Sequence, residues 1–230
     1  MKITVTDSII LRRVNYGEAD RIVTVLSKDL GKVAVLARGV RKLKSKLAGG
    51  LELLSVNELT LIQGKGDMYA LRSARMKLQL HGILESYERS EQAFAALKQI
   101  SQLVEDSEGT EFYTLLEEYL KALNDGLELA LAETWWSLRL LAELGHMPNL
   151  TTAADGKPLD ETAVYLFNAE EGTFIRTDTH SENGFMAAHI KLWRLALQLE
   201  PLSLAQIKNG TTLAELGIQS LRLLIANHTN

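Results

Sequence analysis

The spacing of hydrophobic and polar positions changes character at about residue 79. Before that point, short segments rich in Ile, Val, Thr and Leu alternate with turn-forming residues such as those at 15–17 and 49–50. The expected strands are 3–14, 20–27, 32–38, 58–63 and 67–75. Several short strands in so short a span are typical of a small closed barrel, and an OB-type barrel is the best candidate.

After residue 80 the apolar positions recur with the period of a helix. Phe112, Leu115, Leu116 and Tyr119 lie at the spacing of one amphipathic face. The segment 127–145 is apolar on two sides, which is typical of a helix at the centre of a bundle. The expected helices therefore cover 94–104, 112–123, 127–145, 185–199 and 213–227, and Thr212 with Glu215 predicts a capping box at the start of the last.

Residues 146–183 interrupt this helical pattern. They contain Asp155-Gly156 and Pro158, followed by a predicted hairpin with strands 163–168 and 173–178. The predicted fold class is therefore α+β. An N-terminal OB-fold β-barrel (1–79) precedes an all-α helical domain (80–230), which carries a small irregular β-hairpin insert at 146–183.

The charge of the chain is divided unevenly along its length. The net charge of −4 argues by itself against a polyanionic partner. Residues 1–80, however, contain 15 Lys and Arg against 7 Asp and Glu, whereas residues 81–230 contain 10 against 22. An asymmetry of this size suggests two parts with different partners, and the basic part is the candidate for binding nucleic acid.

A basic stretch without any acid follows the third expected strand. Cations at this density attract phosphates without reading base sequence, although a solvated surface loop is the simpler alternative. Gly39 within the stretch allows the backbone to bend there. The candidate DNA-binding residues are Arg38, Arg41, Lys42, Lys44, Lys46, Lys32, Arg12 and Arg13, with Lys65, Arg72, Arg75 and Lys77 as further cations of unknown orientation.

Aromatic residues are scarce in the β part, which contains only Tyr16 and Tyr69. Proteins that bind single strands usually add aromatic platforms on which bases stack. If this chain binds DNA, we therefore expect charge to dominate and salt to weaken the binding steeply.

Trp135 and Trp136 are adjacent within the helical part. The interpretation favoured by the pattern is that both pack in the bundle core. The alternative is that Trp136 lines a partner-binding groove near Arg139, which would suit an acidic, aromatic-tailed peptide.

Motifs for catalysis or for metal binding do not emerge from the sequence. The chain has no cysteine, which excludes thiolate nucleophiles and disulfides and suits a reducing cytosol. His180 and His189 lie near Asp178 and Glu182, but their spacing matches no ligand motif. We therefore expect no enzymatic activity, no cofactor and no metal. The N-terminus lacks the apolar region of a signal peptide, and no apolar run has the length of a membrane helix.

Several segments resemble the RecO family of bacterial DNA repair and recombination mediators. The segment 9–27, which contains Tyr16-Gly17-Glu18-Ala19-Asp20, is similar to the first two strands of that family. Residues 37–47 resemble its "A-K-G-x-R-x-x-x-S-x-L" stretch, and 144–150 resembles the helix end before its zinc-ribbon-like insert. The order of the expected elements agrees over nearly the whole chain.

The resemblance implies an OB-fold, a helical domain and an insert. It also implies binding to single- and double-stranded DNA, strand annealing, partnership with RecR, contact with the acidic tail of single-stranded DNA-binding protein, and help in loading RecA. Many members carry four cysteines in the insert, but the matching positions near Thr152, Asp155 and 175–179 have none. We therefore expect this insert to fold without zinc, held by its hairpin.

The sequence thus predicts a non-enzymatic DNA repair mediator, monomeric when alone, cytoplasmic and associated with the bacterial nucleoid. An alternative is a protein-interaction scaffold whose basic barrel grips an acidic protein. A nuclease is a third possibility, but it needs a carboxylate cluster that the basic part does not supply.

Overall fold

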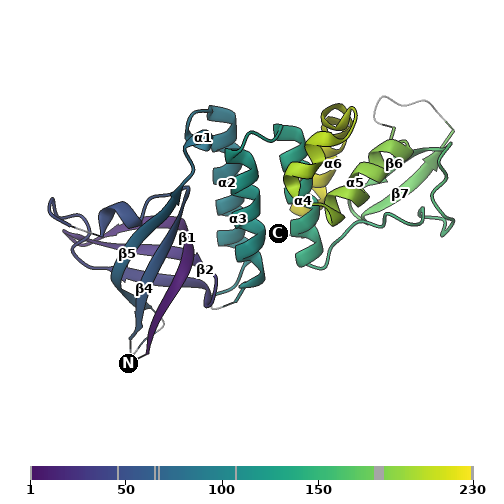
Figure 1. Ribbon diagram of the computed structural model, residues 1–230. Helices are drawn as coiled ribbons and strands as arrows, with labels where there is room; N and C mark the ends of the chain where they lie inside the picture. Colours follow the sequence, from purple (N-terminus) through teal and green to yellow (C-terminus); the bar gives the residue numbers. More distant parts are fainter. Residues whose placement is uncertain are drawn as a thin grey trace. The chain divides into compact units, whose positions relative to one another are not determined.

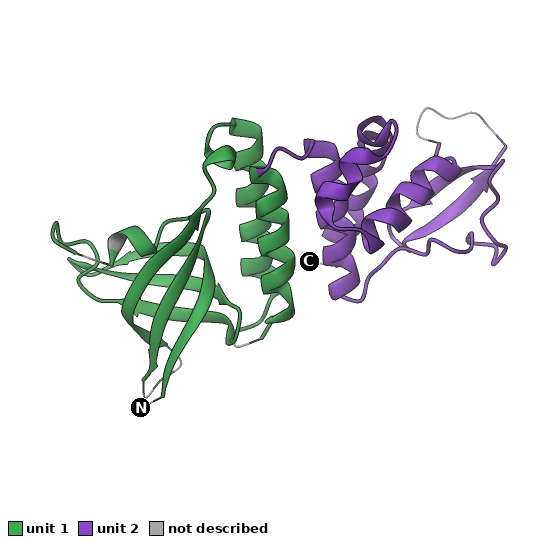
Figure 2. Ribbon diagram, in the orientation of Figure 1, with its two compact units in different colours: residues 1–124 green, residues 125–230 purple. Residues whose placement is uncertain are grey.

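The structure is a computed structural model that describes residues 2–45, 47–64, 66, 68–106, 108–178 and 184–228. It divides into two compact units, Met1–Asn124 and Asp125–Asn230 (Figure 2). Among the described residues, no helix is both long and apolar enough to cross a membrane.

Unit 1 begins with a closed β-barrel (Figure 1). Its strands are β1 (Ile3–Tyr16), β2 (Asp20–Ser27), β3 (Gly31–Ala37), β4 (Ser55–Gln63) and β5 (Tyr69–Gln79), with the 3-10 turn η1 (Ala48–Gly50) before β4. Their order around the barrel is β1-β2-β3-β5-β4, and the parallel contact of β3 with β5 joins the two halves. This is the topology of an OB-fold, so the predicted fold class is confirmed.

Alternation along the strands separates an inner face from an outer face. Val23, Val25, Val33 and Val35 point inward and form the barrel core with Ile10 and with residues from β4 and from the segment before it. Their neighbours Ile22, Thr24, Ala34 and Leu36 therefore lie on the outer face and are only partly buried.

Three helices complete unit 1: α1 (His81–Leu84), α2 (Tyr87–Leu103) and α3 (Glu111–Asn124). Helix α2 packs on β1, and α3 packs on β1, β2 and β3. By alternation Ile9 and Leu26 point to the outer face, yet both are fully buried, because these helices cover one part of it.

The compact units do not divide where the sequence period changes. The predicted domains were 1–79 and 80–230, whereas the segment that carries α1–α3 belongs to the compact unit of the barrel. The reason is that the change of period marks a change of secondary structure, while the unit boundary depends on which apolar surfaces cover one another.

Unit 2 is a helical unit with a small β insert. It contains α4 (Leu129–Glu143), the hairpin β6 (Val164–Asn168) and β7 (Thr173–Thr177), α5 (Ala187–Gln198), the 3-10 helix η2 (Pro201–Gln206) and α6 (Gly210–His228). Helix α4 packs against α5, α6 and η2 and is buried on most sides, as its apolar pattern predicts. The capping box predicted at Thr212 is wrong, because α6 already begins at Gly210.

The predicted hairpin is present, and aromatic rings close the insert around it. Phe167 and Phe174 of the hairpin pack with Phe185 and with Trp193 of α5, and Tyr165 packs against Phe174, at ring-centroid distances from 5.0 to 6.3 Å. The sequence contains no cysteine, so no disulfide or thiolate ligand holds this insert. The apolar interior between hairpin and helix thus supplies the cohesion of this insert.

Candidate nucleic-acid interface

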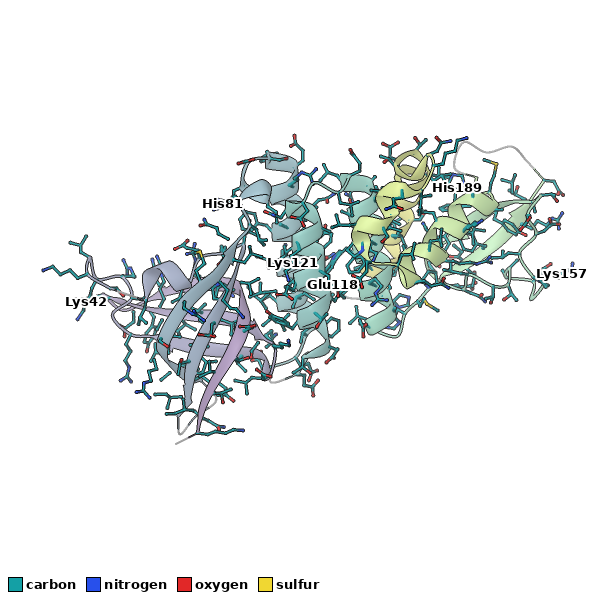
Figure 3. All side chains as sticks on the ribbon, in the orientation of Figure 1. Lys42, His81, Glu118, Lys121, Lys157 and His189 are labelled. Carbon is teal, nitrogen blue, oxygen red and sulfur yellow. The ribbon has the colours of Figure 1, made fainter. Side chains whose placement is uncertain are left out.

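The basic turn, residues 38–44, follows β3 directly. Arg38, Arg41, Lys42 and Lys44 are all exposed there, and none of them forms an ion pair with a described residue. Lys42 lies at the end of the barrel away from α2 and α3 (Figure 3). Lys46, predicted to belong to the same group, lies outside the described residues. The turn therefore presents at least four positive charges that form no ion pair with a described acid.

Backbone hydrogen bonds attach the basic turn to the turn between β1 and β2. Gly39 N–H donates to Asp20 Oδ1 at 2.7 Å, and Arg41 N–H donates to Ala19 O at 2.9 Å. Gly39 has φ +64°, a conformation that glycine adopts without strain. Arg41 Nη1 also donates to Gly17 O at 3.3 Å. The cations consequently project from a fixed backbone, which limits the entropy lost when they bind a ligand.

The open part of the outer face lies beside this turn. The strand register places Arg12 of β1 opposite Thr24 of β2, and Val14 opposite Ile22. Ile22 in turn lies opposite Leu36 of β3. Arg12, Val14 and Tyr16 are exposed at alternate positions along β1 and so lie on one face. Arg12 is thereby placed on the same open face as an apolar row, close to the end of the barrel that carries the cations.

Two of the predicted DNA-binding residues are engaged elsewhere. The ammonium group of Lys32, whose side chain is only 11% exposed, donates to Ser101 O at 3.0 Å and pairs with Asp106 at 3.2 Å. Arg13 Nη1 donates to Leu51 O and to Glu52 Oε2. Both therefore hold parts of unit 1 together, and the structure separates them from the exposed cations of the basic turn.

Among the further cations of β5, some form ion pairs and another forms none with a described residue. Arg75 pairs with Glu58, and Lys77 pairs with Asp7 at 2.8 Å, which raises the pKa of Lys77 above its usual value. Arg72 is exposed at a register shift of β5 and makes no ion pair with a described residue. Lys65 lies outside the described residues.

The tryptophan pair of unit 2 is structural. Trp136 is 3% exposed, and Trp135 Nε1 donates to Leu199 O at 3.0 Å. Arg139 lies over the ring of Trp135 and donates to Leu197 O at 2.9 Å. The alternative in which Trp136 and Arg139 line an open partner groove is therefore corrected to the core interpretation, because Trp136 is buried and the partly buried Arg139 is engaged with Leu197 and Trp135.

No group of three or more metal-binding side chains comes together among the described residues. His180 and Glu182 lie outside them. His189 Nδ1 accepts a hydrogen bond from Met186 N–H at 3.0 Å, and burial lowers its pKa. His189 thus stabilises the start of α5 in its neutral form.

Comparisons of the sequence with known protein families identify one family over both parts of the chain. The profile described as "Recombination protein O N terminal" matches residues 1–79, and "Recombination protein O C terminal" matches residues 84–224. The chain belongs to the Recombination protein O (RecO) family, which functions in DNA repair and recombination.

Relatives named DNA repair protein RecO come from several bacteria. The Heliobacterium modesticaldum protein is 29% identical over 93% of this chain and 80% of its own length. The Dehalococcoides mccartyi (strain CBDB1) protein is 33% identical over 74% of this chain and 67% of its own length. The Roseiflexus protein is 37% identical over 68% of this chain, and the match spans 55% of that relative.

Proposed function

We propose that this RecO-family chain binds DNA through the phosphate backbone, by means of the basic turn and the open face of β1. The observation that carries the proposal is that Arg38, Arg41, Lys42 and Lys44 are exposed, form no ion pair with a described acid and project from an anchored backbone. Neighbouring like charges repel one another, and a polyanion relieves that repulsion. We include Arg12, on the open face of β1, and the exposed Arg72 of β5 in the proposed positive surface.

Binding of this kind supports strand annealing without catalytic groups. Two complementary strands repel through their phosphates, and a protein that neutralises those charges lowers the cost of their approach. We therefore propose a mediator that anneals strands and has no enzymatic activity. Incubation with DNA and Mg²⁺ should give no cleavage, and turnover that depends on Mg²⁺ would contradict this part of the proposal.

Unit 2 is the part that we assign to protein partners. It contains 7 Lys and Arg against 13 Asp and Glu, so its net charge disfavours contact with DNA. The family membership supports RecR and RecA loading as its context, in the bacterial cytoplasm at the nucleoid. The acidic tail of single-stranded DNA-binding protein has the same sign of charge as unit 2, so we propose it as a partner of the chain without placing it on this unit. Pull-down of purified RecR tests the first of these, and no binding at micromolar concentrations would contradict it.

The DNA-binding proposal is tested by fluorescence anisotropy with a labelled single-stranded oligonucleotide across a salt series. We expect the logarithm of the affinity to fall linearly with the logarithm of the salt concentration. Replacing Arg41, Lys42 and Lys44 together by Glu should lower the affinity at low salt at least about tenfold, because three attractive contacts become repulsive.

A matched control separates local contacts from total charge. Replacing Lys98, Lys191 and Lys208 by Glu changes the net charge of the chain by the same amount, at exposed positions outside the basic turn. This control should retain most of the affinity. Equal loss in both triple variants would show that no local site exists, and unchanged affinity in the basic-turn variant would overturn the proposal.

A further inference from the structure

Tyr16 is an exposed aromatic side chain at the edge of the proposed DNA surface. It ends β1 and is 56% exposed. The other aromatic residue of the barrel sequence, Tyr69, is partly buried and packs against the barrel core. Tyr16 thus has a ring available for a ligand, whereas the ring of Tyr69 is already used by the fold.

The position of Tyr16 connects it with the cations of the basic turn. The next residue, Gly17, accepts the hydrogen bond from Arg41 Nη1. The register partner of Tyr16 on β2 is Asp20, whose carboxylate accepts the hydrogen bond from Gly39 N–H in the basic turn. Tyr16 also follows Val14 and Arg12 on the open outer face. A strand held by the cations therefore has its bases within reach of this ring.

We propose that Tyr16 stacks on an unpaired base and so gives the interface a preference for single-stranded over duplex DNA. The inference rests on the DNA binding proposed above and deepens it. Phosphates are offered by both forms of DNA, so the cations alone distinguish them poorly. An unpaired base has a free face on which an aromatic ring can stack, whereas bases within a duplex already stack on their neighbours.

The test compares the affinities of the full-length chain for a single-stranded oligonucleotide and for a duplex of equal length, by anisotropy at a fixed salt concentration. Tyr16→Ala should weaken single-strand binding by about 5- to 100-fold, the range found for loss of one base–aromatic stack. Duplex affinity should change less than about twofold, and Tyr16→Phe should retain the single-strand affinity because the ring remains.

An abasic oligonucleotide gives a second measurement. It keeps the phosphates but lacks the bases, so the wild type should bind it as weakly as Tyr16→Ala binds the normal oligonucleotide. For the abasic oligonucleotide, Tyr16→Ala and the wild type should have nearly the same affinity. Tyr87→Ala is the matched control, because Tyr87 is an exposed tyrosine at the start of α2. It should leave both affinities unchanged.

The outcomes distinguish this inference from the proposed function. If the wild type binds neither form of DNA at low salt, both fail. If it binds DNA but Tyr16→Ala changes the two affinities equally or not at all, the stacking role fails while DNA binding stands. If Leu43→Ala rather than Tyr16→Ala abolishes the preference for single-stranded DNA, the stacking role of Tyr16 also fails, since Leu43 is the fully exposed apolar residue of the basic turn.

Discussion

The amide of Gly39 donates a 2.7 Å hydrogen bond to the carboxylate of Asp20. This contact joins the basic turn to the first residue of β2, and so it ties the exposed cations to the barrel. It also places an acidic residue inside a positively charged region, where its charge opposes phosphate binding while its hydrogen bond maintains the geometry.

The two roles of Asp20 are separable by substitution. Asp20→Ala should lower the free energy of unfolding by about 1–2 kcal/mol, because the Gly39 amide loses a charged acceptor. Asp20→Asn keeps an acceptor oxygen and removes the negative charge, so it should bind DNA at least as tightly as the wild type. Urea unfolding followed by circular dichroism, with anisotropy in parallel, measures both effects. Weaker DNA binding by Asp20→Asn than by Asp20→Ala would contradict this assignment.

Lys32 and Lys42 should behave oppositely when each is changed to Met. Lys32→Met removes the contacts with Ser101 and Asp106 and should lower the free energy of unfolding by about 1–3 kcal/mol. Its effect on the salt dependence of DNA binding should be small. Lys42→Met should leave stability nearly unchanged and reduce the salt slope by about 0.7 for a single strand. The same slope change in both variants would show that Lys32 also contacts phosphates.

The aromatic cluster of the insert provides a test of how that segment is held. Phe174 is fully buried between the hairpin and Trp193, so Phe174→Ala should cost about 3–5 kcal/mol of unfolding free energy. Tryptophan fluorescence reports this transition, since all three tryptophans lie in unit 2. Prior treatment with EDTA should leave the wild-type unfolding midpoint unchanged. A lower midpoint after EDTA, restored by zinc, would show that a metal holds the insert.

His189 should make stability depend on pH. Burial lowers its pKa in the folded state, so the unfolded chain binds a proton at a higher pH than the folded chain does. The contribution of His189 to the free energy of unfolding is therefore complete above its pKa in the unfolded chain, about 6.5, and is lost as the pH falls below that value. When the pH is lowered from 7.5 to 5.5, we expect the unfolding midpoint to decrease more in the wild type than in His189→Gln. An equal fall in both proteins would assign the pH dependence to other groups.

Much of the secondary structure was predictable from the sequence because its causes are local. The hairpin predicted at 163–168 and 173–178 is present as β6 and β7, since alternating apolar residues flank a turn-forming segment. The predicted central helix at 127–145 corresponds to α4, because its apolar pattern on two sides requires burial on two sides. The number and length of the strands made an OB-type barrel the best candidate, and the structure then showed its closure and strand order.

The candidate site was predictable only in part. The exposed cations of 38–44 lie close together in one stretch that contains no acid, so the sequence alone identified them as a group. The exposure of Tyr16 was not predictable, because the alternation of one strand does not show which part of its outer face the helices cover. The burial of Trp136 was an open alternative for the same reason.

By itself, the sequence determined the periods of its elements, the barrel followed by helices, and the concentration of positive charge after the third strand. Only the tertiary structure decided which cations remain available for a ligand. Lys32 meets Asp106, and Lys77 meets Asp7 across 70 positions of sequence, whereas the cations of the basic turn meet no described acid. Secondary structure depends mainly on neighbours within a few residues, but the partner of a charged side chain depends on which distant segments folding brings beside it.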